Sequence, residues 1–84
     1  MDGLTEGRMV HYVLPDGPSK GEHRPAIIVK VWNVSGGCEG YSNLQVFTDF
    51  TNDGDKYASG QYWATSKCYS AEPKEDTWHW IEKA

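Results

Sequence analysis

The stretch Arg-Pro-Ala-Ile-Ile-Val-Lys-Val-Trp, residues 24–32, is the longest apolar and β-branched run in the chain, and it predicts a central strand. Both faces of this strand are largely apolar at period two. We expect one face to fill the core and the other to meet a flap, a ligand or another subunit. The expected core face carries Ile27, Val29 and Val31, and the opposite face carries Ala26, Ile28, Lys30 and Trp32.

Four further segments alternate between apolar and polar residues and predict strands at 8–14, 43–48, 61–69 and 77–81. The connections between them are rich in Gly, Pro and Asp, and none has helical periodicity. The chain therefore predicts one all-β domain over residues 1–84, a five-stranded antiparallel barrel or sandwich without substantial helix, with residues 1–6 frayed. The opening Gly7–Val13, a loop and the run 26–31 together resemble the start of SH3-like barrels.

Composition excludes several classes of partner. The formal net charge is −4 and no run of Lys or Arg occurs, which argues against binding of long nucleic acids. No apolar run reaches transmembrane length, and no secretory signal is visible, so we expect a cytoplasmic protein. Cys38 and Cys68 would then be reduced thiols, whereas an oxidising compartment would allow one bridge between them.

Aromatic residues are numerous for a thin core, with four Trp and five Tyr in 84 residues. In an extended segment 77–81, Trp78 and Trp80 point the same way and His79 points oppositely. The two indoles would form a flat surface on which a base can stack, or else would be buried in a core or subunit contact. Trp63 shares its face with Thr65 and Lys67, so we expect it to point away from the core.

The loop 49–60 is too polar to be core and is read as a solvated turn, with Asp49 and Asn52 able to contact ribose hydroxyls or an adenine edge. Its first half matches the oxygen-ligand spacing of an EF-hand loop. The comparison fails at the twelfth position, which is Gly60 instead of a bidentate carboxylate.

Catalytic and metal-binding signals are weak. His11, His23 and His79 match no zinc-ligand spacing, and only a fold that brought them together would make a site, for example with a cysteine. We therefore expect no metal and no cofactor. Since no nucleophile elbow or catalytic carboxylate pair is visible, we also expect no enzyme activity.

Several motifs together resemble a group of short proteins encoded by tailed bacteriophages and prophages. The motifs are His-Tyr-Val-Leu at 11–14, Arg-Pro-Ala-Ile-Ile-Val at 24–29, Asn-Leu-Gln-Val-Phe-Thr-Asp at 43–49, Trp-Ala-Thr-Ser at 63–66 and Thr-Trp-His-Trp at 77–80. Phe50 departs from the pattern, because a glycine usually follows the aspartate in that group.

The resemblance implies one of two functions. The first is a homo-oligomeric binding protein of the host cytoplasm that sequesters a nucleotide immune signal, such as a cyclic ADP-ribose isomer or a cyclic dinucleotide, and so inhibits anti-phage defence. The expected ligand-binding residues are Trp63, Trp78, Trp80, His79, Asp49, Asn52 and Arg24, with Lys67 as a second cation for a pyrophosphate. The alternative is a non-enzymatic structural or interaction module that binds a phage or host protein.

Overall fold

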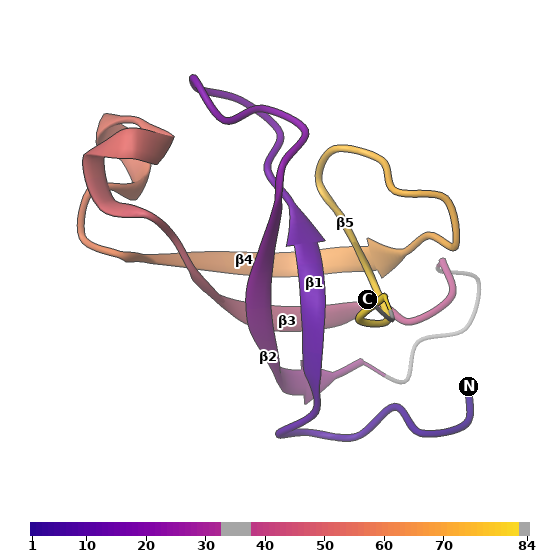
Figure 1. The fold of residues 1–84 in the computed structure, drawn as a ribbon. Helices are drawn as coiled ribbons and strands as arrows, with labels where there is room; N and C mark the ends of the chain where they lie inside the picture. Colours follow the sequence, from indigo (N-terminus) through magenta and orange to yellow (C-terminus); the bar gives the residue numbers. More distant parts are fainter. Residues whose placement is uncertain (33–37, 83–84) are drawn as a thin grey trace.

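The computed structural model describes residues 1–32 and 38–82, and its five strands close into a barrel in chain order. The strands are β1 (Met9–Val13), β2 (His23–Val31), β3 (Ser42–Phe47), β4 (Gln61–Tyr69) and β5 (Thr77–His79). In Figure 1, β1 and β2 cross in front of β3 and β4, so the two layers run at a steep angle. The predicted all-β fold and its barrel form are confirmed.

The strand pairing is antiparallel from β1 through β4, and β1 also pairs antiparallel with β5, which closes the barrel. One pair departs from the expected arrangement. Strand β5 runs parallel to β4, with Cys68 opposite Thr77 and Tyr69 opposite Trp78. The connection over residues 70–76 carries the chain back along the barrel before β5 begins, so the last two strands do not form a hairpin.

The core face of β2 is the reverse of the predicted one. Ala26 and Ile28 are fully buried, whereas Val29 is 44% exposed. Register explains the difference, because Ala26 lies opposite Val10 on β1 and Val46 on β3, which both point into the barrel. A β-bulge between Ile28 and Lys30 then shifts the pairing with β3.

The segment after β3 forms two 3-10 turns, Phe50–Asp53 and Asp55–Tyr57. The prediction that this loop is too polar to contribute to the core is wrong, because Asp53 and Tyr57 are both fully buried. Phe50 has a φ of 47°, a left-handed conformation that glycine adopts without steric cost. The loop is thus a folded cap on one end of the barrel.

Three other interactions tie the loops and the N-terminal segment to the barrel. A disulfide joins Cys38 and Cys68, with their Cα atoms 5.7 Å apart, so the alternative of one bridge is the one that the structure contains. Near the N-terminus, where fraying was expected, Leu4 packs against the core and Glu6 accepts a hydrogen bond from the Val31 amide. The connection between β2 and β3 was predicted from the sequence as a turn over residues 33–42, and its residues 33–37 lie outside the described part of the chain.

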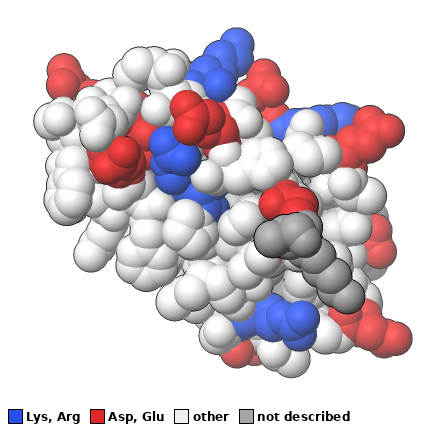
Figure 2. Space-filling model, in the orientation of Figure 1, with Lys and Arg blue, Asp and Glu red and all other residues white. Residues whose placement is uncertain are grey.

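The surface in Figure 2 carries basic and acidic side chains side by side on the face shown, without a broad basic field. Two lysines lie next to carboxylates: the half-exposed Lys56 is 3.2 Å from Asp16, and the mostly buried Lys67 is 2.7 Å from Asp76. Within the described ranges, no helix has the length and apolar character needed to span a bilayer.

Candidate metal centre

Three histidines and one glutamate converge on the outer side of the barrel: His11, His23, His79 and Glu82. One donor atom from each side chain lies within 4.8 Å of all the others. The histidines are held on three different strands, whereas Glu82 follows β5 in the C-terminal segment. No pair of these residues except His79 and Glu82 is close in sequence.

Strand register accounts for the meeting of the histidines. His11 lies directly opposite His79 in the β1–β5 pair. It lies opposite Pro25 in the β1–β2 pair, so His23, two residues before Pro25, is its diagonal neighbour on the same face. Because Val10 and Tyr12 point into the core, His11 points outward, and the two neighbouring histidines share that side.

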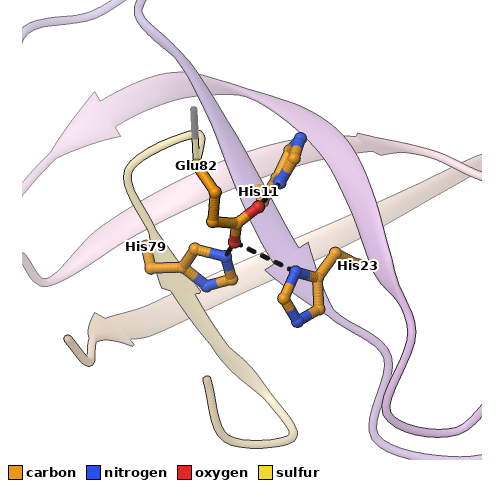
Figure 3. A group of neighbouring side chains, drawn as sticks. All are labelled: His11, His23, His79 and Glu82. Atoms are coloured by element: carbon orange, nitrogen blue, oxygen red, sulfur yellow. Dashed lines mark hydrogen bonds and ion pairs between the residues drawn. The ribbon is translucent and has the colours of Figure 1, made fainter. Parts of the chain in front are cut away.

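The carboxylate of Glu82 lies between the three imidazole rings, as Figure 3 shows. Its Oε2 atom is 2.9 Å from Nδ1 of His11, and its Oε1 atom is 3.0 Å from Nδ1 of His23 and also contacts Nε2 of His79. An ionised carboxylate can only accept hydrogen bonds, so Nδ1 of His11 and Nε2 of His79 each donate an N–H hydrogen bond to Glu82. Together with Nδ1 of His23, these ring nitrogens point at one small volume.

The electrostatics favour a neutral imidazole at His79 beside an ionised carboxylate at Glu82. Burial lowers the pKa of His79, and the neighbouring histidines lower it further, although Glu82 acts in the opposite direction. For Glu82, desolvation acts to raise the pKa, but hydrogen bonds from His79 and His11 outweigh it and lower the pKa to about 2. Neutral imidazole and ionised carboxylate are the protonation states in which these groups bind metals.

This donor set suits a transition-metal ion. Three imidazole nitrogens and one carboxylate oxygen match zinc coordination, in which donors lie about 2.0–2.2 Å from the ion and hence about 3.3 Å from one another. The largest separation of 4.8 Å would need to shrink by about 1.5 Å, which side-chain rotation can supply. Imidazole also suits copper, nickel and iron, whereas magnesium and calcium prefer oxygen ligands.

Of the two alternatives for Trp78 and Trp80, the flat stacking surface is wrong and packing in the core is the one that the structure contains. Their rings are nearly perpendicular, at 82° with centroids 5.1 Å apart, and Trp78 is fully buried. The Trp78 indole N–H donates to the carbonyl of Gly40 at 2.8 Å, which satisfies its one polar atom inside the barrel. Trp80 lies beyond the end of β5 and packs against the core, with the Arg8 guanidinium 5.0 Å from its ring centroid.

The other expected ligand-binding residues fall into separate places. Trp63 is 48% exposed on the outer face of β4, which confirms that it points away from the core. Arg24 approaches the loop of Asp49 and Asn52 through the buried carboxylate of Asp53, to which the Asp49 amide also donates. Thus the polar loop residues meet, but His79 belongs to the histidine cluster.

The sequence contained a signal for this cluster that spacing alone did not reveal. His11 precedes the buried Tyr12, and His79 follows the buried Trp78. Because neighbouring side chains of a strand point to opposite faces, both histidines point outward. In a closed five-stranded barrel the first strand adjoins both the second and the last, so outward histidines on these three strands meet. The fourth donor is Glu82 and not a cysteine, since Cys38 and Cys68 bond to each other.

Comparison with known proteins leaves the chain without an assigned relative: it matches no family model, no curated protein and no solved structure.

Proposed function

We propose that this chain is a small non-enzymatic binding protein whose ligand is a divalent transition-metal ion of the zinc class. The observation that carries the proposal is the convergence of His11, His23, His79 and Glu82, with all four donor atoms within 4.8 Å of one another. Histidines on paired strands are prepositioned for a metal, so little conformational entropy is lost when the metal binds.

The competing interpretation is a hydrogen-bonded cluster that holds the C-terminal segment against the barrel. Both interpretations rest on the same contacts, but they predict different responses to added metal. A metal ion would bind the ring nitrogens that now face Glu82, so each neutral ring would carry its proton on its other nitrogen. Protonation of the rings would compete with the metal, and binding should therefore weaken as pH falls. A purely structural cluster should not respond to added metal.

A titration of chelator-treated protein with Zn²⁺ and Co²⁺ tests the proposal, with calorimetry for affinity and Co²⁺ visible absorption for coordination. We expect binding of one ion per chain and a higher midpoint of thermal unfolding, by about 2.7 kcal/mol of stability at one hundred times the dissociation constant. His11→Ala and His23→Ala should each weaken binding by at least about a hundredfold, because each removes a ligand.

Glu75→Gln is the matched control, because Glu75 is an exposed carboxylate outside the cluster. It should bind metal like the unaltered chain. Absence of binding in folded protein would overturn the proposal, as would binding that survives both histidine substitutions. In that case the cluster would be a hydrogen-bonded anchor for the C-terminal segment.

Capture of a nucleotide immune signal by a homo-oligomer, expected from the phage resemblance, stays a prediction. Both basic groups assigned to a pyrophosphate are already paired, since Arg24 binds Asp53 and Lys67 binds Asp76. Thermal denaturation against cyclic and ADP-ribose nucleotides tests it. A saturable rise in the midpoint with one nucleotide class would support the prediction, and no rise with any class would contradict it.

A second candidate, a protein-interaction module, is favoured by the outer surface of the barrel. The outer row across β1 to β4 includes Met9, which is 43% exposed and lies opposite Ile27, and Trp63, which is 48% exposed and lies opposite Gln45. A convex apolar surface of this kind suits a protein partner better than a small ligand, which needs a concave pocket. Loss of capture of a phage or host protein on Trp63→Ser substitution, with the fold retained, would support it.

A further inference from the structure

We infer that a metal ion at this site would be held by the three histidines and would have an exchangeable fourth ligand, an inference that rests on the proposed metal site. External oxyanions would then compete with the carboxylate of Glu82 for the fourth position. The ligand class is a monodentate oxyanion, either a carboxylate or a phosphate. The inference goes beyond metal binding because it makes the centre a receptor for a second ligand.

The four donors are unequally anchored to the barrel. His11 and His79 are register partners within the sheet, and His23 lies at the start of β2, so backbone pairing on three strands fixes the Cα and Cβ positions of these histidines and leaves only their side chains to rotate. Glu82 lies three residues beyond β5 and outside the sheet. Displacing a donor outside the sheet costs less free energy than displacing a donor on a paired strand, because no backbone hydrogen bond of the sheet has to break.

Solvent reaches the cluster most readily at Glu82. The Glu82 side chain is 47% exposed, against 25% for His11, 31% for His23 and 5% for His79. Water and small anions therefore meet Glu82 first, and His79 is the most shielded donor.

The carboxylate of Glu82 lies where a metal ion would bind. It contacts all three rings, so its oxygens occupy the volume on which the ring nitrogens converge. A metal ion at that point requires the carboxylate to withdraw toward solvent. From there Glu82 can return only as the fourth ligand, in competition with any other oxyanion. Three fixed histidines with one exchangeable position is the arrangement of zinc sites that bind external ligands.

Chemical rescue by acetate tests this inference, because acetate carries the same carboxylate as the Glu82 side chain. Co²⁺-loaded protein is titrated with acetate, and separately with inorganic phosphate, while visible absorption reports the coordination sphere. We expect Glu82→Ala to bind acetate saturably, with an affinity at least about tenfold higher than that of the unaltered chain, since the tethered competitor is gone. Glu75→Ala should behave like the unaltered chain.

The outcomes separate the two proposals. If Co²⁺ binds but neither anion changes the spectrum of Glu82→Ala, the exchangeable position is overturned and metal binding stands. Equal anion affinity with and without the Glu82 carboxylate would also overturn it, because Glu82 would not be the competing ligand. If the unaltered chain binds no Co²⁺, the proposed metal site itself fails. A response to acetate alone or to phosphate alone supports the inference and identifies which oxyanion the site accepts.

Discussion

The Arg24 guanidinium contacts both carboxylate oxygens of Asp53, with Nε 2.8 Å from Oδ2 and Nη2 2.6 Å from Oδ1. Asp53 is fully buried, and its carboxylate also accepts the backbone N–H of Asp49 at 2.7 Å. This pair joins strand β2 to the first 3-10 turn, 29 residues later in the chain. It therefore holds the loop cap on the end of the barrel.

Substitution of Asp53 by Asn should lower the free energy of unfolding by about 3 kcal/mol, because it leaves the largely buried Arg24 without its counter-charge. Asp55→Asn is the matched control, since Asp55 is exposed in the same loop, and its effect should lie within about 0.5 kcal/mol. Urea denaturation followed by tryptophan fluorescence measures both. Equal effects of the two substitutions would contradict the importance of the buried pair.

The same pair should make the protein less stable in acid. Hydrogen bonding from Arg24 holds the pKa of Asp53 well below its usual value of 3.8, so the unfolded chain takes up this proton at a higher pH than the folded chain does. The stabilisation is complete above pH 3.8 and is lost as pH falls below it. In that range stability should fall more steeply in the unaltered chain than in Asp53→Asn, by up to about 1.4 kcal/mol per pH unit. Parallel slopes would show that Asp53 is not the responsible group.

The two tryptophans Trp78 and Trp63 should differ sharply in their contributions to stability. Trp78 is fully buried, and Trp78→Ala should cost about 3–5 kcal/mol through lost packing and a cavity. Trp63 is 48% exposed on the outer face of β4, so Trp63→Ala should cost less than about 1 kcal/mol. Denaturant unfolding of both variants measures the difference. A similar cost for the two would mean that the face of β4 is misassigned.

The disulfide between Cys38 and Cys68 should be a major source of stability. It closes a loop with a sequence separation of 30, so the loss of chain entropy in the unfolded state corresponds to about 3–4 kcal/mol. The Cys38→Ser, Cys68→Ser double variant should lose this amount and no longer respond to reductant. Mass spectrometry of protein purified without reductant should show two hydrogens fewer than in the reduced form. Two free thiols in such a sample would contradict the disulfide and agree with the prediction of reduced cysteines.

Gly40 should tolerate no side chain, because a Cβ atom there would lie 2.7 Å from Cζ2 of Trp78 and 2.7 Å from Cβ of Tyr69. Gly21 has a similar positive φ, 86° against 69°, but its Cβ would meet nothing within 4 Å. Gly21→Ala thus measures backbone strain alone, about 1–2 kcal/mol. Gly40→Ala should cost at least about 1–3 kcal/mol more in chemical denaturation. Equal costs would show that strain, and not the Trp78 contact, requires glycine at position 40.

Sequence patterns predicted much of the fold. The apolar run at 24–32 located β2, alternation located the other four strands, and the residues sharing the face of Trp63 predicted that it points away from the core. Patterns failed where neither face of a segment was clearly polar. In β2 both faces carry apolar residues, so the sequence pattern does not indicate which face is buried. The register of β2 with β1 and β3 decides that Ala26 and Ile28 point into the core.

The sequence by itself determined the local features: extended segments, turn positions and which side of most strands is apolar. These depend on neighbours one to four residues away, and the residue types carry that information directly. Tertiary structure alone decided that β5 lies beside β1, that Asp53 is buried against Arg24 and that the cysteines pair. It also brought His11 next to Glu82, 71 residues away. Contacts at such separations follow from how the sheet closes, and no local pattern encodes that closure.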